Sequence, residues 1–163
     1  MTTTAYKHTA KTIDERTIQV ERVFDAPRDL VWRAYSEPDL LKQWWGRGNE
    51  VEVVTFEFEK GGHWRVIERY EGGSAGFEGR FREITPKDLI SQTFEWDGMP
   101  GYPVIDTTVF TDEDGGARTK ITVTSQFFNK EEADGMAAAG AESGMAQSYA
   151  ALDALLERLM KAQ

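Results

Sequence analysis

Two carboxyl side chains, Glu68 and Asp106, occupy positions where an ionisable group could do chemistry. Glu68 and Tyr70 are expected to share one face of a strand-like segment with Trp64. A carboxylate among rings would have a raised pKa and could act as an acid or a base. It could equally orient the polar group of a ligand, pair with an arginine, or lie at a solvated rim. Asp106 could also point inward, although the sequence identifies no partner for it.

The other reactive side-chain types form no catalytic or metal-binding pattern. The sequence has no cysteine, which excludes disulfides, thiolate metal sites and a cysteine nucleophile. It has 2 histidines, too few for a zinc site built mainly on histidine. His63 follows a Gly-Gly turn and is expected on the face opposite Trp64, as is typical of a surface histidine. Neither Ser125 nor Ser148 sits in a nucleophile-elbow sequence. We therefore predict no catalytic residue, no bound metal and no cofactor.

The charge balance narrows the class of partner. Asp plus Glu number 28 against 19 Lys plus Arg, which gives a formal net charge of −9. This acidic balance argues against nonspecific nucleic-acid binding and against attraction to an anionic membrane surface. No apolar run is long enough to cross a membrane, and the first residues lack the apolar core of a secretory signal. We expect a cytoplasmic protein with no nucleic-acid partner and no membrane insertion.

The periodicity of the apolar residues places the elements. Residues 16–24 alternate as a strand does, and two short helices with proline near their starts are expected between residues 25 and 46. From residue 50 to residue 127 the period is two, interrupted by glycine-rich and proline-rich turns. A long helix capped by Asn129 is expected to run to about Lys161.

This order of elements defines the fold class. Successive strands joined by tight turns are antiparallel, and their apolar residues share one face that must be covered. The C-terminal helix is the element large enough to cover it. We predict an α+β fold in which a curved antiparallel sheet of about seven strands wraps around one long helix. Residues 16–163 would form this single domain, preceded by a flexible tail over residues 1–15.

The long helix is uneven along its length, and this points to function. Its second half carries leucines that can fill a core, whereas residues 133–146 are rich in alanine and include Gly135, Gly140 and Gly144. A glycine inside a helix costs about 1 kcal/mol relative to alanine, so these glycines need a reason. Small residues opposite the aromatic rings of the sheet would leave an apolar pocket at one end. The alternative is close packing, in which the rings fill that space.

Trp44 and Trp45 are adjacent, so they cannot both point into the core. The second ring would lie on the surface, cover the mouth of the pocket, or contact a protein partner. The side chains expected around a ligand come from the strands, this pair and the long helix: Trp45, Trp64, Val66, Glu68, Tyr70, Phe77, Phe81, Phe94, Trp96, Ile121, Val123, Met136, Ala141, Met145, Ser148 and Tyr149.

Several short motifs give the sequence a family resemblance. They are Val20–Pro27, Trp44-Trp45-Gly46, Gly61–Arg65, Phe94-Glu95-Trp96 and the segment from Asp134 to Ser148. Together they resemble the SRPBCC (START-like) superfamily over about residues 16–161, in the branch homologous to the C-terminal domain of the heat-shock-protein ATPase activator. The resemblance implies a helix-grip fold with a hydrophobic cavity between the sheet and the C-terminal helix.

Three functions are compatible with these observations. The first is binding of a small, mostly hydrophobic ligand, such as a lipid, an aromatic metabolite or an isoprenoid, with Glu68, Tyr70 and Ser148 orienting it. The second, implied by the resemblance, is a co-chaperone-like protein that stimulates a chaperone ATPase. The third is a cyclase- or dehydratase-type enzyme acting on an aromatic or polyketide-like substrate. We favour the binding protein over the enzyme, and an exposed edge strand could also support a homodimer.

Overall fold

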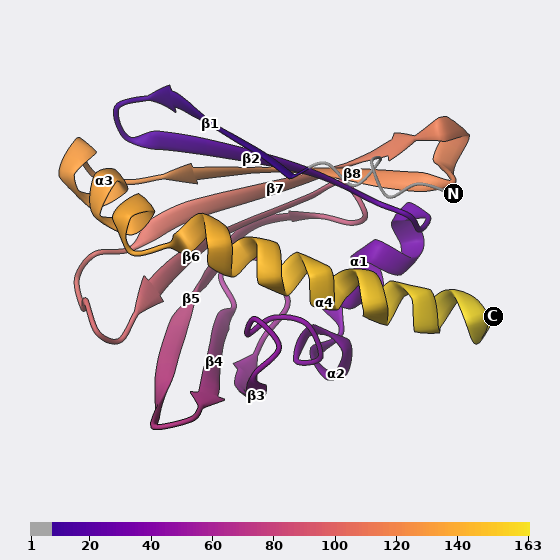
Figure 1. The fold of residues 1–163 in the computed structure, drawn as a ribbon, viewed down its shortest axis with the longest axis horizontal. Helices are drawn as coiled ribbons and strands as arrows, with labels where there is room; N and C mark the ends of the chain where they lie inside the picture. Colours follow the sequence, from indigo (N-terminus) through magenta and orange to yellow (C-terminus); the bar gives the residue numbers. More distant parts are fainter. Residues whose placement is uncertain (1–7) are drawn as a thin grey trace.

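The computed structural model describes residues 8–163. Over these residues the chain forms one eight-stranded antiparallel sheet in the order β1-β2-β8-β7-β6-β5-β4-β3, so β1 and β3 are its edges (Figure 1). Strands β3 to β8 follow one another as sequential neighbours, as the predicted turns require. The strands are β1 (His8–Asp14), β2 (Thr17–Phe24), β3 (Glu50–Phe56), β4 (His63–Tyr70), β5 (Gly73–Thr85), β6 (Leu89–Trp96), β7 (Val104–Glu113) and β8 (Arg118–Gln126).

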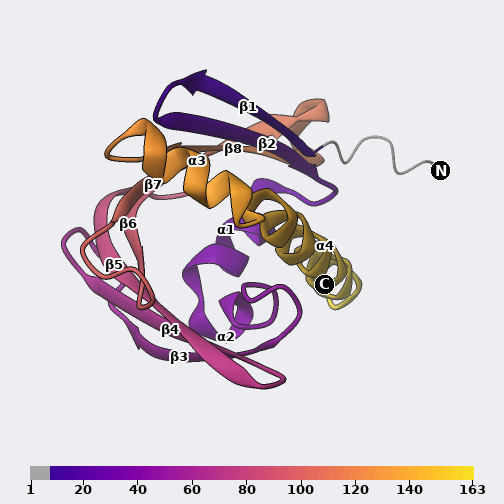
Figure 2. The ribbon, with the colours of Figure 1, turned by 60° about the vertical axis from the view of Figure 1, so that its left-hand side comes forward.

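The helices lie on the concave side of this sheet. Figure 2 shows the sheet curving around α1 and α2, with α4 crossing the open side of the curve. None of the described helices is both long and apolar enough to cross a membrane. One antiparallel sheet with helices on its concave side confirms the predicted α+β class. The helices are α1 (Arg28–Ser36), α2 (Pro38–Leu41), the 3-10 turn η1 (Asp114–Gly116), α3 (Lys130–Ala138) and α4 (Ala141–Lys161).

The N-terminal segment differs from the flexible tail predicted over residues 1–15. His8–Asp14 form β1, which pairs with β2 so that Ala10 lies opposite Val20, while residues 1–7 lie outside the described residues. The side chains of residues 9–14 are all exposed, so no apolar pattern marks this strand. Backbone hydrogen bonds to the otherwise open edge of β2 hold it instead. The sheet consequently has eight strands rather than about seven.

The predicted long C-terminal helix is divided into two. α3 ends at Ala138 and α4 begins at Ala141, and Gly140 between them has a φ of +85°. Glycine adopts this left-handed conformation without the steric penalty that other residues meet, so the chain can change direction there. The Asn129 cap is confirmed, because the backbone N–H of Glu132 donates to Asn129 Oδ1 at 2.9 Å.

The hydrophobic core fills one end of the concave face. Leu152, Leu155 and Leu156 of α4 belong to one buried cluster with Phe110 of β7. Trp32 of α1 packs edge to face on Phe110, with 5.3 Å between ring centroids. Each such side chain stabilises the fold by roughly 1.5–3 kcal/mol on burial. The leucine-rich half of α4 is thereby fixed against the sheet, and its alanine- and glycine-rich half faces the other end.

Candidate ligand-binding cavity

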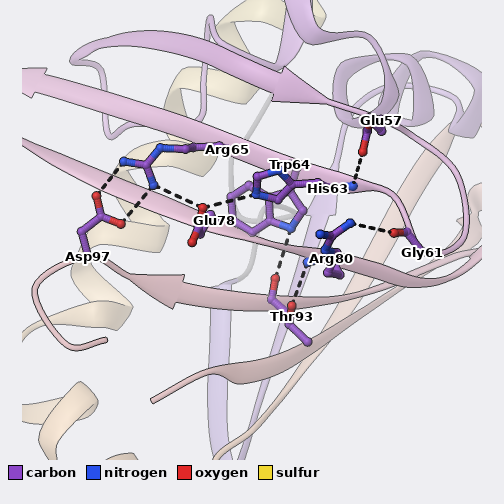
Figure 3. A network of polar contacts seen from close by, with 9 residues as sticks. All are labelled: Glu57, Gly61, His63, Trp64, Arg65, Glu78, Arg80, Thr93 and Asp97. Atoms are coloured by element: carbon purple, nitrogen blue, oxygen red, sulfur yellow. Dashed lines mark hydrogen bonds and ion pairs between the residues drawn. The ribbon is translucent and has the colours of Figure 1, made fainter. Parts of the chain in front are cut away.

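A cavity of about 500 Å³ lies between the concave face of the sheet and the α3–α4 region. Its wall is aromatic: the Trp45 and Phe77 ring centroids are 5.1 Å apart, and those of Phe77 and Phe94 are 5.3 Å apart. Trp64 extends this wall, and its indole N–H donates to the carbonyl oxygen of Thr93 at 3.1 Å (Figure 3). The indole N–H thus has its hydrogen-bond acceptor within the sheet, and the ring presents an apolar surface to the cavity.

Small residues line the helical side of the cavity. Ala141 and Gly144 face it from the first turns of α4, beside Met145. A Cβ atom on Gly144 would lie 3.1 Å from Cδ of Arg47, whereas one on Gly140 would meet nothing within 4 Å. Gly144 therefore permits a close approach, and Gly140 supplies a backbone conformation. The rings do not fill the space that these residues leave, so close packing does not describe this end of the molecule.

The first polar group, which we call the mouth cluster, consists of the cavity-lining residues Arg47, Glu68 and Ser148 together with Asn49, which donates to Glu68. The Glu68 side chain is 3% exposed, and its Oε2 accepts hydrogen bonds from Arg47 Nε at 3.0 Å, Arg47 Nη2 at 2.8 Å and Asn49 Nδ2 at 2.6 Å. The backbone N–H of Arg47 donates to Ser148 Oγ at 3.0 Å. These bonds tie the loop that follows α2 to β4 on one side and to α4 on the other. The buried carboxylate is therefore neutralised by a guanidinium.

The second polar group, which we call the floor row, consists of Gln92, Asp106 and Ser125. The three residues lie opposite one another on β6, β7 and β8, and all three line the cavity. Ser125 Oγ donates to Asp106 Oδ1 at 2.6 Å. Burial raises the pKa of Asp106 to about 6, against the lowering effect of the Ser125 hydrogen bond. This carboxyl group can accept a hydrogen bond from a molecule in the cavity and can gain or lose a proton close to neutral pH.

Two phenols lie near the floor row. Burial raises the pKa of the Tyr149 hydroxyl on α4, and the charge of Asp106 raises that pKa further. Burial also raises the pKa of Tyr35 on α1 well above its ordinary value. Both phenols therefore stay protonated at neutral pH and add no charge. The Tyr35 hydroxyl is buried with no hydrogen-bond partner among the described residues.

A family model described as Activator of Hsp90 ATPase homolog 1-like protein matches residues 25–157. The chain belongs to this family. The match spans the helices, the sheet from β3 onward and most of α4. The fold and the branch that the sequence motifs resembled are thus confirmed for this member of the family.

Solved structures of other proteins share the fold. A crystal structure from Rhodobacter sphaeroides has a TM-score of 0.83 at 24% identity, covering 94% of this chain and 99% of that one. A solution structure from Arthrobacter aurescens has a TM-score of 0.84 at 24% identity, covering 95% and 93%. A protein from Chromobacterium violaceum has a TM-score of 0.73 at 26% identity, covering 86% and 97%. No curated protein matches the chain.

In this family member, the residues expected around a ligand gather at the cavity with one exception. Ile121 does not line it and is fully buried in the hydrophobic core instead. It lies on the same face of β8 as Val123 but two residues further from the cavity, and alternation alone does not show where along a strand a cavity ends. Tyr70 and Trp96 lie at the rim, where they are 43% and 40% exposed. Contact with a ligand stays a prediction for all of these residues.

Of the adjacent tryptophans only Trp44 is fully buried in the core, and Trp45 is half-buried in the cavity wall rather than on the surface. Trp44 is buried and its indole N–H donates to the Ala34 carbonyl oxygen at 2.9 Å, whereas Trp45 packs on the aromatic wall. His63 lies on the outer face of β4, where its Nε2 is 3.2 Å from Glu78 Oε1 (Figure 3). Arg65 on the same face forms ion pairs with both Glu78 and Asp97. This network stabilises the outside of the sheet, and none of its residues lines the cavity.

Sequence reasoning missed the partners of both carboxylates. Arg47 follows the Trp-Trp-Gly motif in a loop and has a φ of +58°, and no periodicity predicts where such a loop directs its side chains. Gln92 alternates with Ile90 and Phe94 on an inward-facing strand pattern, and a polar residue in that pattern was an available signal. Ser125 was separated from Asp106 by 19 residues, and the register that joins them is set by the hairpin between β7 and β8.

Proposed function

We propose that this protein binds a small, mostly apolar molecule in the cavity between the sheet and α4. The observation that supports the proposal best is the cavity itself, about 500 Å³ in volume and walled by the rings of Trp45, Trp64, Phe77 and Phe94. Ligand sites of small molecules are typically apolar concavities of roughly 300–1,000 Å³ with a few convergent polar groups.

Burial of apolar area would supply most of the affinity. Each Å² of apolar surface removed from water is worth about 25 cal/mol before the costs of ordering the ligand and the protein are subtracted. The flat rings favour a planar or cyclic ligand body, which stacks on them with little loss of side-chain entropy. At the rim, Tyr70 and Ser148 would orient the exposed end of the ligand.

The test is a fluorescence titration with an environment-sensitive apolar dye, compared between the wild type and Met145→Trp. Met145 lines the cavity from α4, so the larger ring would occupy ligand space. We expect dye affinity to fall at least about tenfold, because the ligand loses buried area while the fold keeps its leucine core. Thermal unfolding of the variant should show a transition no lower than that of the wild type.

Met160→Trp is the matched control. Met160 lies near the C-terminus of α4, is 42% exposed and is absent from the cavity lining. Its dye affinity should equal that of the wild type. Equal binding by Met145→Trp and the wild type would place the dye outside the cavity and contradict the proposal. Native mass spectrometry of the purified protein, followed by extraction, would then identify a natural ligand.

A further inference from the structure

The floor row is a polar band on a mostly apolar cavity floor. Gln92 pairs with Asp106, and Asp106 pairs with Ser125, across three neighbouring strands. On one side of this band Phe94 lies opposite Val104. On the other side Thr108 faces both Ile90 and Val123, and all three side chains are buried. A ligand lying on this floor would meet the floor row between apolar side chains, with the Thr108 hydroxyl as one further polar group on the second side.

Within the described residues, only part of the hydrogen-bonding capacity of this band is used. Asp106 Oδ1 accepts from Ser125, but Oδ2 accepts no hydrogen bond from any described residue. The Gln92 side chain has no hydrogen-bond partner among the described residues, although it faces the same space. Polar groups in an apolar site are destabilising when they lack partners, so a bound molecule that completes them gains affinity and specificity.

The two polar groups of the cavity differ in what they can offer. In the mouth cluster, Arg47 already engages Glu68 with two donors, so this acid does not need a ligand to neutralise it. Over residues 8–163 no cation faces Asp106 in the floor row, and the groups around it are Ser125, Gln92 and the Tyr149 phenol from α4. A ligand that brings a hydrogen-bond donor would satisfy Asp106, whereas a ligand carboxylate would meet a like charge.

We propose that the ligand carries one hydrogen-bond-donating group, a hydroxyl or a protonated amine, and binds with this group on Asp106 and its apolar body against the aromatic wall. This inference rests on the proposed function and names the class of molecule that the cavity selects. Gln92 and Ser125 flank the donor and fix its position along the strand direction. An acidic ligand of the same size binds more weakly than its neutral counterpart.

Four probes with one ring system test the inference: naphthalene, naphthol, naphthylmethylamine and naphthoate. In the wild type near pH 7.5, we expect naphthol and the amine to bind more tightly than naphthalene, the amine by about tenfold or more, and naphthoate most weakly. Equal binding of the first three would overturn the inference while leaving apolar binding intact. If none of the four binds, the proposed function itself fails, and the inference fails with it.

Variants at Asp106 assign the effect to that carboxyl. In Asp106→Leu, which has a similar shape and no acceptor, naphthol and the amine should lose their advantage over naphthalene. In Asp106→Asn, which keeps an acceptor but no charge, the amine should lose its advantage while naphthol keeps most of its own. Naphthalene affinity reports whether each variant retains the cavity. An advantage that persists in Asp106→Leu would show that the donor binds elsewhere.

Asp112→Asn is the matched control, because Asp112 lies on the same strand but has a half-exposed side chain paired with Arg28. All four affinities should equal those of the wild type.

A second experiment needs no variant and stays decisive if a substitution unfolds the protein. When the pH is lowered from 7.5 to 5, most of the Asp106 carboxyl becomes protonated, because its pKa is about 6. The wild type should then bind the amine with little more affinity than naphthalene. An amine advantage that does not change over this range would overturn its pairing with Asp106.

Discussion

The mouth cluster and the floor row place one carboxyl group each in the same cavity, but they treat the charge in opposite ways. Glu68 is enclosed by Arg47 and Asn49, with three hydrogen bonds to one oxygen. Asp106 has one hydrogen bond, from Ser125, and its pKa rises to about 6. The first arrangement fixes a loop, and the second leaves a group available. The degree of internal pairing therefore separates a structural acid from a candidate binding acid.

This contrast follows from the elements that carry the two residues. Glu68 lies near the end of β4, next to a loop whose side chains can turn back on it. Asp106 lies among paired strands, where its neighbours are fixed by register and offer neutral groups. A strand interior can present a polar side chain to a cavity, but a loop is needed to surround it with donors.

The largest expected effect comes from removing the cation of the mouth cluster. Arg47→Met should lower the free energy of unfolding by about 2–3 kcal/mol, because it leaves the buried Glu68 without a neutralising partner. This is below the upper range for buried pairs, since the Arg47 side chain is 45% exposed. Urea denaturation followed by tryptophan fluorescence measures the change.

Arg33→Met is the control for that substitution. Arg33 pairs with Glu37 on α1, where both side chains are about half exposed, and its loss should change stability by no more than about 0.5 kcal/mol. Adding Glu68→Leu to Arg47→Met should restore most of the lost stability, because no buried charge then remains. If Arg47→Met and Arg33→Met have equal effects, the mouth cluster is not a buried ion pair in energetic terms.

The next prediction is a substitution in the floor row that raises the free energy of unfolding. The pKa of Asp106 is higher in the folded state, about 6, than the ordinary 3.8, so folding binds protons and stability falls as pH rises between these values. The difference corresponds to roughly 3 kcal/mol at neutral pH. Asp106→Asn should therefore stabilise the protein by about 2 kcal/mol at pH 7.5, because the pKa of about 6 already includes the effect of the Ser125 hydrogen bond and asparagine keeps an acceptor for it.

The pH dependence of that gain is the decisive readout. Near pH 4 the wild-type carboxyl is already protonated in the folded state, so the variant and the wild type should have nearly equal free energies of unfolding. Asp112→Asn should show no such widening gap, because its carboxylate lies at the surface. A constant difference between pH 4 and pH 7.5 would mean that Asp106 is not desolvated as the structure indicates.

The smallest expected effect concerns the link between the mouth cluster and α4. Ser148→Ala removes the acceptor of the Arg47 backbone N–H. Alanine also favours the helix slightly, so global stability should change by less than about 0.5 kcal/mol. Hydrogen exchange at the Arg47 amide should nevertheless become faster by about tenfold, because local opening no longer breaks that bond. Unchanged exchange would show that the loop is held by Glu68 alone.

Much of the fold could be predicted from the sequence because its signals are local. Alternation placed Trp64, Val66 and Glu68 on one face, and the leucine repeat placed the buried part of α4. β1 escaped prediction because its side chains are exposed and only backbone pairing holds it. The division at Gly140 was missed because a glycine within a helical pattern can be tolerated or can end the helix, and the pattern does not distinguish the two.

The candidate site was predictable in its apolar part and unpredictable in its polar part. The rings that form the wall follow from strand periodicity, since burial drives them to one face. Arg47 reaches Glu68 across 21 residues through a loop with a left-handed backbone, and Ser125 reaches Asp106 through strand register. These pairings depend on tertiary geometry. The sequence identified both carboxylates as candidates and placed only Glu68 among the expected ligand contacts, whereas in the structure Asp106 is the acid with fewer internal partners.

The polar strand β1 has a consequence for how the molecule meets other molecules. Without it, the backbone of β2 would offer open N–H and C=O groups beside a core strand, which is a template for intermolecular sheet growth and aggregation. With it, the outer edge carries exposed side chains that include the charged Lys11. A neighbouring chain adding to this edge would have to desolvate Lys11, and Ile13 is the one large aliphatic side chain that residues 9–14 would offer it. The strand thus replaces the edge of a core strand with one that is less favourable for sheet growth.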